Sequence, residues 1–409
     1  MLNDLTKKKK IKEIIKSAKD KSLISGKSHT FYRYPAAFSP FFAETIIENF
    51  TKPGDAILDP FVGGGTSAVE AFALQRKFYG IDVNPLSVLV SKVKTTILSH
   101  KKIAFIKKFN EKIVNTKINF KSKRRKNHVH LSHYFNTKNF SNEEIRKINQ
   151  IKAGLEQYHF AISKIKDVAI RNFLTCLLLR TAKNILDNVR PVGSFKKFKV
   201  DLVNNCNRML SDMVDFEKEL EINKSIYGSH NKVKILKSDI LKLRKINSLK
   251  KGKIKLILTS PPYPGINISY NRWQLHGRRD TKLPYWIMNT KAPVFTKLNY
   301  KHGKKRELND YYQNMTKVFR NLRPYCSSSC LIVKLLSFRN KIKEFRMYRE
   351  AMDKAGLEEI KILKKGDGRL WRTVPKRRWQ VRYSKKKLKS NKEVLLVYKY
   401  KNGVNLNEI

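Results

Sequence analysis

Three observations on the sequence predict an α/β protein in which a seven-stranded sheet carries a mostly helical insertion. Short apolar segments alternate with helix-forming segments over residues 56–98, and the same alternation returns over residues 233–400. Between them, residues 99–230 contain long mixed charged and apolar stretches with few strand signals. The 409 residues are 41% hydrophobic and 11% aromatic, which is typical of a chain that folds around a sizeable core.

The first alternating region predicts two strands and two helices. The apolar run 56–60 ends in turn residues and is followed by three glycines, and residues 66–75 then have a helix-forming composition. Residues 78–82 form a second apolar run that ends in an acid, and the next predicted helix, 85–98, has proline in its first turn. Because strands and helices alternate, we expect the strands to be parallel.

The insertion, residues 99–230, splits the predicted α/β domain into residues 1–98 and 231–409. After it, apolar runs predict five further strands, at 233–236, 254–258, 331–335, 360–363 and 394–400. Helices are predicted between these strands at 309–322 and 341–355. Two strands before the insertion and five after it make the predicted total of seven.

The charge balance indicates a polyanionic partner. Lys and Arg number 88 against 33 Asp and Glu, so the formal net charge is +55 at pH 7. Nucleic acid is the first candidate, because each phosphate that Lys or Arg neutralises releases a condensed counterion. The alternative is a lysine-rich composition that serves no such partner.

Several features predict a cytoplasmic protein without membrane association. No apolar run approaches the roughly 20 residues that cross a bilayer. The first twenty residues are rich in lysine and lack the apolar core of a secretory signal. The four cysteines are too few and too scattered for a disulfide framework: Cys176, Cys206, Cys326 and Cys330. They have no partner pair at metal-ligand spacing, and His128 and His130 lie in a basic run, so no metal site is predicted.

Glycines and acids follow the predicted strands at the place where an open α/β sheet binds ligands, outside the carboxyl ends. Gly63 and Gly65 permit a close approach of the backbone to a ligand, and Asp82 can accept hydrogen bonds from both hydroxyls of a ribose. Asp59 and Asp239 end two further strands. A tight turn that serves packing alone is the alternative interpretation of the glycines. No P-loop sequence occurs, so ATP on such a loop is not expected.

The segment from Asp59 to Thr66 reads D-P-F-V-G-G-G-T and resembles the D-P-F-x-G-x-G-T motif I of amino-directed DNA methyltransferases, which bind S-adenosylmethionine. The resemblance implies a Rossmann-like seven-stranded methyltransferase sheet and a cofactor site at its strand ends. The methionine end of the cofactor would then lie on Asp59, Phe61, Gly63, Gly65 and Thr66. Asp82 would hold the ribose, and Asp239 would lie near the adenine.

An upstream segment, residues 29–40, resembles motif X of the same family, which closes over the methionine moiety. This resemblance implies that Tyr34 and Pro35 contact the cofactor. The alternative is an aromatic-rich stretch that packs on the first helix of the sheet.

The run Ser260, Pro261, Pro262, Tyr263 follows a predicted strand and suits chemistry on an exocyclic base amine. The lone pair of such an amine is delocalised into the ring, so a site must supply hydrogen-bond acceptors, which the Ser260 hydroxyl and the Pro261 carbonyl can be. Both prolines fix the backbone, and Tyr263 offers a flat face for an extruded base. The run resembles motif IV of the family, in which serine is more typical of cytosine-N4 enzymes. The alternative is a Pro-Pro turn that caps a strand above a buried tyrosine.

Three regions are candidates for contact with DNA. One is the insertion, residues 99–230, and another is the segment 264–306, in which Trp273 and Tyr285 stand among basic residues. The third is a late basic run, favoured for phosphate contact: Arg369, Trp371, Arg372, Lys376, Arg377, Arg378, Trp379 and Arg382. The sequence reader is expected in the insertion or in the late basic run, and the sequence leaves that choice open.

Together the motifs predict an S-adenosylmethionine-dependent DNA methyltransferase that acts on cytosine N4, before adenine N6, in a restriction-modification or orphan modification system. The expected partner is double-stranded DNA with its target base flipped, and a cognate restriction endonuclease is a second candidate partner. An RNA amino-group methyltransferase and a non-catalytic nucleic-acid-binding paralogue are the alternatives. The target sequence and the oligomeric state are not predicted.

Overall fold

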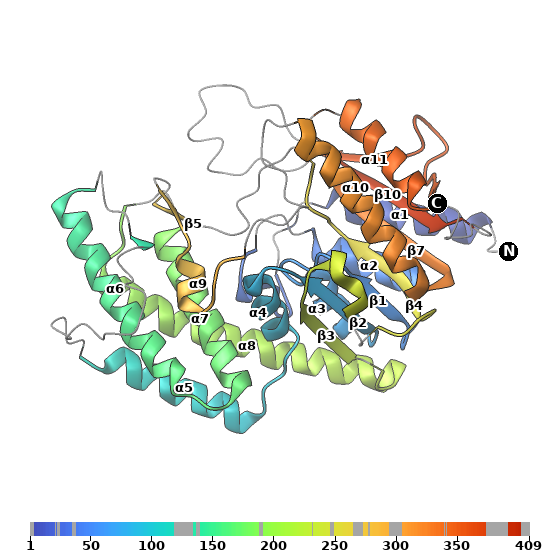
Figure 1. Ribbon diagram of the computed structural model, residues 1–409. Coiled ribbons are helices and arrows are strands. Elements are labelled where there is room, and N and C mark those ends of the chain that lie inside the picture. The colour runs from blue at the N-terminus through green and yellow to red at the C-terminus, as the bar shows by residue number, and fades with distance from the viewer. Residues whose placement is uncertain are drawn as a thin grey trace.

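The computed structural model shows a sheet covered by helices on both faces, beside a separate group of long helices (Figure 1). It describes residues 4–20, 22, 25–34, 38–117, 134–135, 140–187, 191–230, 232–245, 249–264, 273–276, 279–293, 305–338, 340, 342–373 and 392–401. Pro35, His128, His130 and the part of the late basic run after residue 373 lie outside these ranges.

The sheet has eight strands in the described residues, where seven were predicted. Seven follow one another in the order β3-β2-β1-β4-β7-β10-β8, and β9 also pairs with β10. Their bounds are β1 Ala56–Asp59, β2 Lys77–Asp82, β3 Lys232–Lys237, β4 Ile254–Thr259, β7 Cys326–Ser337, β8 Leu357–Ile360, β9 Leu370–Thr373 and β10 Lys392–Tyr400. Strands β3, β2, β1, β4 and β7 are parallel, whereas β10 is antiparallel to β7, β8 and β9. The predicted parallel α/β sheet is therefore confirmed, with an antiparallel margin.

That margin is where the strand prediction is wrong. The strand predicted at 360–363 lies at 357–360, because the chain turns after Ile360 and the amides of Ile362 and Leu363 both donate to the Gly368 carbonyl. Strand β9 follows this turn and pairs with residues 392–395 of β10. Strand β8 pairs with residues 397–400 on the same edge of β10. Two short strands therefore share one edge of β10.

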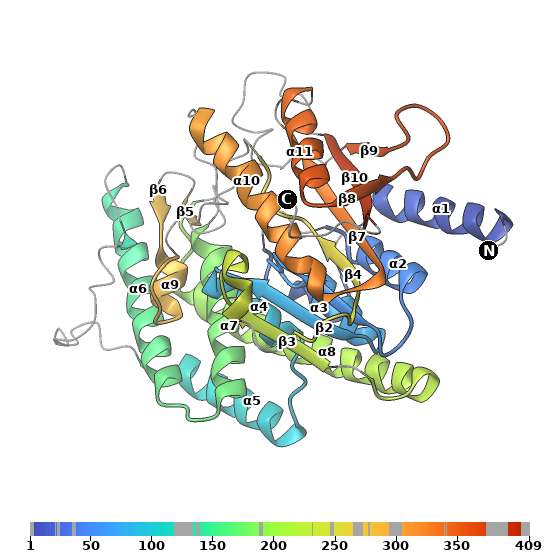
Figure 2. The same ribbon diagram turned by 45° about the vertical axis from the view of Figure 1, so that its right-hand side comes forward.

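Alternating side chains of the strands pack against two layers of helices. On β1, Ile57 packs with α2 (Pro40–Phe50) and α3 (Thr66–Ala73), whereas Leu58 packs with α10 (Lys305–Leu322) and α11 (Lys343–Lys354). The helix α1 (Asp4–Lys19) adds Ile14 to the first layer. This period of two buries both faces of the sheet, as a parallel sheet requires. Figure 2 shows α10 and α11 together over the sheet and α1 at its edge.

The described part of the insertion is helical, as predicted. It forms α5 (His100–Asn115), α6 (Asn142–Ser163), α7 (Val168–Leu186) and α8 (Phe195–Tyr227), which lie to one side of the sheet (Figure 1). Side chains cap three of these helices at Ser141, Asp167 and Ser194. Helix α8 reaches back to the sheet, where Asn223 Nδ2 donates to the Ala73 carbonyl at 2.9 Å and Phe216 meets Phe72 edge to face. The long helix thereby ties the insertion to α3.

The segment after the double-proline turn also joins the helical group. It forms β5 (Trp273–Leu275), β6 (Arg279–Thr281) and α9 (Leu283–Ile287), and its apolar side chains share one core with α7. Trp273 is 3% exposed and donates from Nε1 to the Tyr32 hydroxyl at 3.0 Å, and Tyr285 is 1% exposed. The interpretation of these two aromatics as part of a DNA-contacting loop is therefore wrong. None of the described helices is both long and apolar enough to span a membrane.

Candidate functional site

The carboxyl ends of four neighbouring parallel strands, β3, β2, β1 and β4, bring the predicted site residues to one edge of the sheet. The Thr259 hydroxyl at the end of β4 donates to Asp59 Oδ1 at the end of β1, at 2.6 Å. The Ser238 amide after β3 donates to the Asp82 carbonyl oxygen at the end of β2, at 3.0 Å. The glycine loop after β1 and the double-proline turn after β4 therefore lie side by side.

Asp59 is the most enclosed carboxylate of this edge, with 2% of its surface exposed. Besides Thr259, it accepts hydrogen bonds from the Phe61 amide at 3.0 Å and from the Ser67 hydroxyl at 2.6 Å. Burial raises the pKa of Asp59 to about 6, although all three hydrogen bonds favour the charged carboxylate and oppose that rise. The carboxylate thus joins β1, β4 and α3, whose first residue is Thr66.

The glycine loop needs its glycines for conformation and for space. Gly63 has φ +51° and Gly65 has φ +77°, in the left-handed region that favours glycine. A Cβ built on Gly65 would lie 2.7 Å from Ser91 Oγ and 3.1 Å from Ser91 Cα, so the loop packs directly on α4 (Pro85–Lys94). Any side chain at residue 65 would displace the loop.

Two side chains of α4 donate hydrogen bonds to backbone carbonyls of this loop, and neither was predicted from the sequence. Ser91 Oγ donates to the Gly63 carbonyl at 3.2 Å, and Lys94 Nζ donates to the Gly64 carbonyl at 2.9 Å. Lys94 is only 4% exposed, and burial lowers its pKa to about 8. Ser87, Ser91 and Lys94 recur every three or four residues on an otherwise apolar buried face, and that spacing is the signal that could have identified them.

Asp82 faces the glycine loop. Its Oδ2 accepts from the Gly63 amide at 3.0 Å and its Oδ1 from the Asn84 amide at 2.8 Å, and burial raises its pKa. The Ser87 side chain and the Val83 amide also interact with this carboxylate, so a ligand would share its acceptor positions with these donors. The half-buried Asp239 lies next to this strand end and accepts from the Leu241 amide at 3.0 Å.

Tyr34 covers the glycine loop from the N-terminal segment. A Cβ built on Gly64 would lie 2.7 Å from the Tyr34 Cβ, and the Tyr34 hydroxyl accepts from Ser87 Oγ at 2.7 Å and Asn84 Nδ2 at 3.1 Å. Asn84 Oδ1 in turn accepts from the Tyr285 hydroxyl at 3.1 Å. Tyr34 therefore packs on the loop that was expected to hold the methionine end of the cofactor.

The double-proline turn places Ser260 and Tyr263 within hydrogen-bond distance of each other. Ser260 Oγ is 3.1 Å from the Tyr263 hydroxyl and 3.1 Å from the Leu335 carbonyl oxygen. The Pro262 carbonyl accepts from the Tyr311 hydroxyl at 2.7 Å, whereas no hydrogen bond to the Pro261 carbonyl occurs within the described part of the chain. Tyr263 is 8% exposed and packs in the core below α10, so only a small part of its ring is accessible to a base.

The late basic run was expected to contact phosphates, and this is wrong for its first arginines. Arg369, 8% exposed, donates to both carboxylate oxygens of Glu359, at 2.5 and 2.7 Å. Arg372 donates to Glu393 Oε2 from Nε at 2.8 Å and from Nη2 at 2.6 Å. These guanidinium groups join strands of the sheet margin and are not available as free cations.

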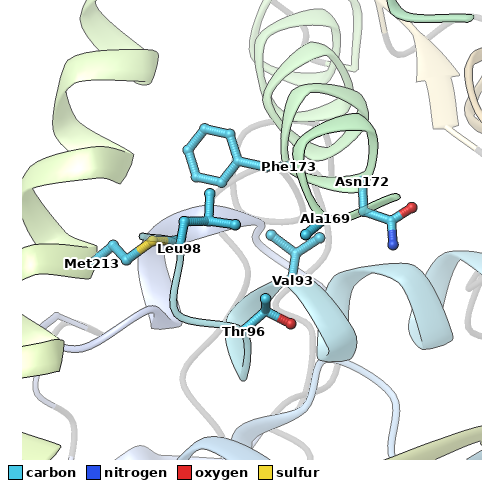
Figure 3. Close-up of a pocket in the computed structure, with 7 residues that line it drawn as sticks. All are labelled: Val93, Thr96, Leu98, Ala169, Asn172, Phe173 and Met213. Atoms are coloured by element: carbon cyan, nitrogen blue, oxygen red, sulfur yellow. The ribbon is translucent and has the colours of Figure 1, made fainter. Parts of the chain in front are cut away.

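A small cavity lies between the end of α4 and the helices α7 and α8 (Figure 3). Its volume is about 20 Å³, and its lining is Val93, Thr96, Leu98, Ala169, Asn172, Phe173 and Met213. A cavity of this size holds about one water molecule. None of its lining residues belongs to the predicted cofactor site.

Comparison with known proteins identifies relatives of part of the chain. Residues 3–92 match a family model described as DNA methylase. The type II methyltransferase M.MvaI of Kocuria varians is 41% identical over 80 residues, 19% of this chain and 18% of that protein. The type II methyltransferase M.BsoBI of Geobacillus stearothermophilus is 24% identical over 258 residues, 58% of this chain and 49% of that protein.

A shorter match is more similar. The type II methyltransferase M2.DpnII of Streptococcus pneumoniae is 50% identical over 50 residues, 12% of this chain and 19% of that protein. The chain thus spans at most about half the length of these three relatives. Among solved structures, the rRNA methyltransferase aviRa from Streptomyces viridochromogenes is 11% identical with a TM-score of 0.31 and covers 90% of this chain and 89% of its own. A similarity this low carries no argument about function.

Proposed function

We propose, from the premise that residues 3–92 of this chain belong to the amino-directed DNA methyltransferase family, that the protein transfers a methyl group to an exocyclic base amine of DNA. The family uses S-adenosylmethionine as methyl donor. One observation carries the proposal. The glycine loop and the Ser260 to Tyr263 turn follow adjacent strands, joined by the hydrogen bond between Asp59 and Thr259. A donor on the first and an acceptor base on the second would lie next to each other.

The residues of the strand ends fit the proposed cofactor. The backbone of the Gly63 to Gly65 loop would approach the methionine end, which Tyr34 would cover. Asp59, Phe61 and Thr66 are proposed as further contacts at that end. Asp82, which the Gly63 and Asn84 amides hold in place, would accept from the ribose hydroxyls, and the half-buried Asp239 would stand near the adenine. When bound, the cofactor supplies an electrophilic methyl group on sulfur. Pro35 is proposed as a further contact, on the motif X resemblance alone.

The Ser260 to Tyr263 turn would prepare the amine. We expect the amino hydrogens to be donated to Ser260 Oγ and to the Pro261 carbonyl, which draws the nitrogen lone pair out of the ring toward the methyl group. Pro261 and Pro262 hold these acceptors in place. The exposed part of the Tyr263 ring is the proposed stacking face for the extruded base, worth about 1–3 kcal/mol, while its hydroxyl stays hydrogen-bonded to Glu393. Alignment of the amine with the methyl group would supply much of the rate, since orientation alone can contribute about 7–11 kcal/mol.

Cytosine N4 is the proposed target atom, and adenine N6 is the second candidate. The serine of the turn supports this order, since it resembles the cytosine-N4 variant of motif IV. We further propose that the substrate is double-stranded DNA with a flipped base, in a restriction-modification or orphan system with or without a cognate endonuclease. Residues 99–230 are proposed as the DNA-recognition region and residues 1–98 with 231–409 as the catalytic domain.

Mass spectrometry of nucleosides tests this function. The purified protein is incubated with methyl-labelled S-adenosylmethionine and either genomic DNA or total RNA, and the products are digested to nucleosides. N4-methylcytosine from DNA is the expected result, and N6-methyladenine would change the assigned base. Methylated RNA beside unmodified DNA would refute the DNA assignment. Cofactor binding with no transfer to either nucleic acid would support a non-catalytic protein instead.

A further inference from the structure

A chain of hydrogen bonds runs from the double-proline turn into the margin of the sheet. Ser260 Oγ is 3.1 Å from the Tyr263 hydroxyl, which donates to Glu393 Oε1 at 2.8 Å. The other oxygen of Glu393 accepts from Nε and Nη2 of Arg372, whose Nη1 donates to the Ala18 carbonyl of α1 at 3.0 Å. The chain thus joins β4, β10, β9 and α1. Glu393 is 6% exposed and Tyr263 is 8% exposed.

The charges of Glu393 and Arg372 determine the direction of each hydrogen bond in this series. An arginine only donates and a carboxylate only accepts, so Glu393, fixed by Arg372, requires the proton of the Tyr263 hydroxyl. The Tyr263 oxygen can then only accept from Ser260. The Leu335 carbonyl, the other neighbour of Ser260 Oγ at 3.1 Å, can also only accept. The Ser260 proton therefore points into the protein, and the lone pairs of its oxygen are left for an incoming N–H donor.

We propose that Glu393 is a positioning residue for methyl transfer, which acts through Tyr263 to keep Ser260 Oγ a hydrogen-bond acceptor for the amine of the target base. The inference rests on the proposed function of the Ser260 to Tyr263 turn. It assigns a role to a residue that lies 133 positions beyond Ser260 in the sequence and on a different strand. Glu393 is not a catalytic residue, because it touches the tyrosine and not the substrate.

Replacement of Glu393 by glutamine would reverse the direction of the hydrogen bonds from Glu393 to Ser260 while conserving the shape of the side chain. The donors of Arg372 would take the single amide oxygen, so the amide NH₂ would face Tyr263 and donate to it. The Tyr263 proton would then turn to Ser260 Oγ and occupy a lone pair that the base amine needs. We expect Glu393→Gln to lower the single-turnover rate of methyl transfer about tenfold, without change in the affinity for S-adenosylmethionine.

The chain offers a matched control in the same margin of the sheet. Glu359 on β8 is also paired with an arginine, Arg369, through two short hydrogen bonds, and neither residue touches the double-proline turn. Glu359→Gln removes the same charge from an arginine pair that Arg349 at 3.5 Å and Lys361 at 3.2 Å also contact. We expect it to shift thermal unfolding as Glu393→Gln does and to leave the rate of methyl transfer within about twofold of the parent.

A second variant tests the direction of the hydrogen bonds. In Tyr263→Phe the ring is kept but no hydroxyl can donate to Ser260, which still has the Leu335 carbonyl as acceptor. The double variant Glu393→Gln, Tyr263→Phe is therefore expected to be about as active as Tyr263→Phe alone, and several times faster than Glu393→Gln. A merely structural Glu393 would give a double variant slower than either single one.

The experiment measures single-turnover methyl transfer to DNA, the dissociation constant of S-adenosylmethionine and thermal unfolding for the parent and all four variants. A slow Glu393→Gln that is rescued by Tyr263→Phe, with Glu359→Gln near the parent, supports the proposal. An active parent with Glu393→Gln as fast as Glu359→Gln overturns it and leaves the proposed function intact. A parent that transfers no methyl group to DNA overturns the proposed function and this inference with it.

Discussion

Substitution of Gly65 by alanine separates the two reasons for which the loop needs glycine. At φ +77° any side chain costs about 1–2 kcal/mol, since the left-handed region crowds a Cβ against the backbone. The new methyl group would also lie 2.7 Å from Ser91 Oγ, 3.0 Å from its Cβ and 3.1 Å from its Cα. The Cα belongs to α4 and cannot rotate away, so overpacking adds about 1–3 kcal/mol. We expect Gly65→Ala to lower the free energy of unfolding by about 3 kcal/mol and the affinity for S-adenosylmethionine by at least about tenfold.

Gly252 supplies the matched control. It has φ +66°, but a Cβ built on it meets no atom within 4 Å, and it precedes β4 at the opposite end from Thr259. Gly252→Ala should therefore cost only about 1–2 kcal/mol of backbone strain, without overpacking, and leave cofactor affinity unchanged. Isothermal titration calorimetry and urea unfolding measure both quantities. Parent-like affinity in Gly65→Ala would refute the reasoning that the cofactor lies against this loop.

Three further predictions follow from the same strand ends. Asp59 has its pKa raised from an ordinary 3.8 to about 6, so the folded state binds a proton that the unfolded chain releases. The free energy of unfolding should therefore fall by about 3 kcal/mol as pH rises from about 3 to 7. Asp59→Asn should flatten that slope in urea titrations, and an unchanged slope would assign it to other groups. The affinity for S-adenosylmethionine should weaken several-fold as pH rises through 8, because Lys94 then loses the charge that strengthens its hydrogen bond to the Gly64 carbonyl. The variant Lys94→Met should bind the cofactor weakly at every pH. Tyr263→Ala should lose turnover and keep cofactor affinity, whereas Asp82→Ala should lose that affinity. Equal loss of both quantities in Tyr263→Ala would make the tyrosine structural.

The first half of the site could be predicted because its signals are local. Asp59, Gly63 and Gly65 stand within seven residues of one another, and a strand followed by a glycine turn and a helix fixes their arrangement wherever the rest of the chain lies. The adjacency of Ser260 required one further step, the pairing of β1 with β4. The alternation of strands and helices was sufficient to indicate a parallel sheet but not the order of its strands.

The second half could not be predicted, because its contacts join distant residues through side chains. Glu393 accepts a hydrogen bond from Tyr263, 130 positions away in the sequence. Nothing in the local sequence of β10 indicates which residue this acid would contact. Trp273 and Tyr285 were misinterpreted for the same reason. An aromatic residue beside basic residues gives the same local sequence in a DNA-binding loop and in a buried hairpin. Only the packing against α7 distinguishes the two.

The ion pairs of the sheet margin also bear on which lysines and arginines make up the net charge. Arg369 and Arg372 were expected to contact phosphates, yet Arg369 neutralises Glu359 on β8 and Arg372 neutralises Glu393 on β10. With 33 acids for 88 bases, every such pair leaves the excess of 55 positive charges undiminished. A cation without a carboxylate is costly to bury, and Lys94 and Lys334 are enclosed only with a carbonyl oxygen or aromatic rings close to their Nζ atoms. Within the described ranges, most lysines and arginines are accordingly half-buried or exposed, which is the distribution that a phosphate backbone can neutralise.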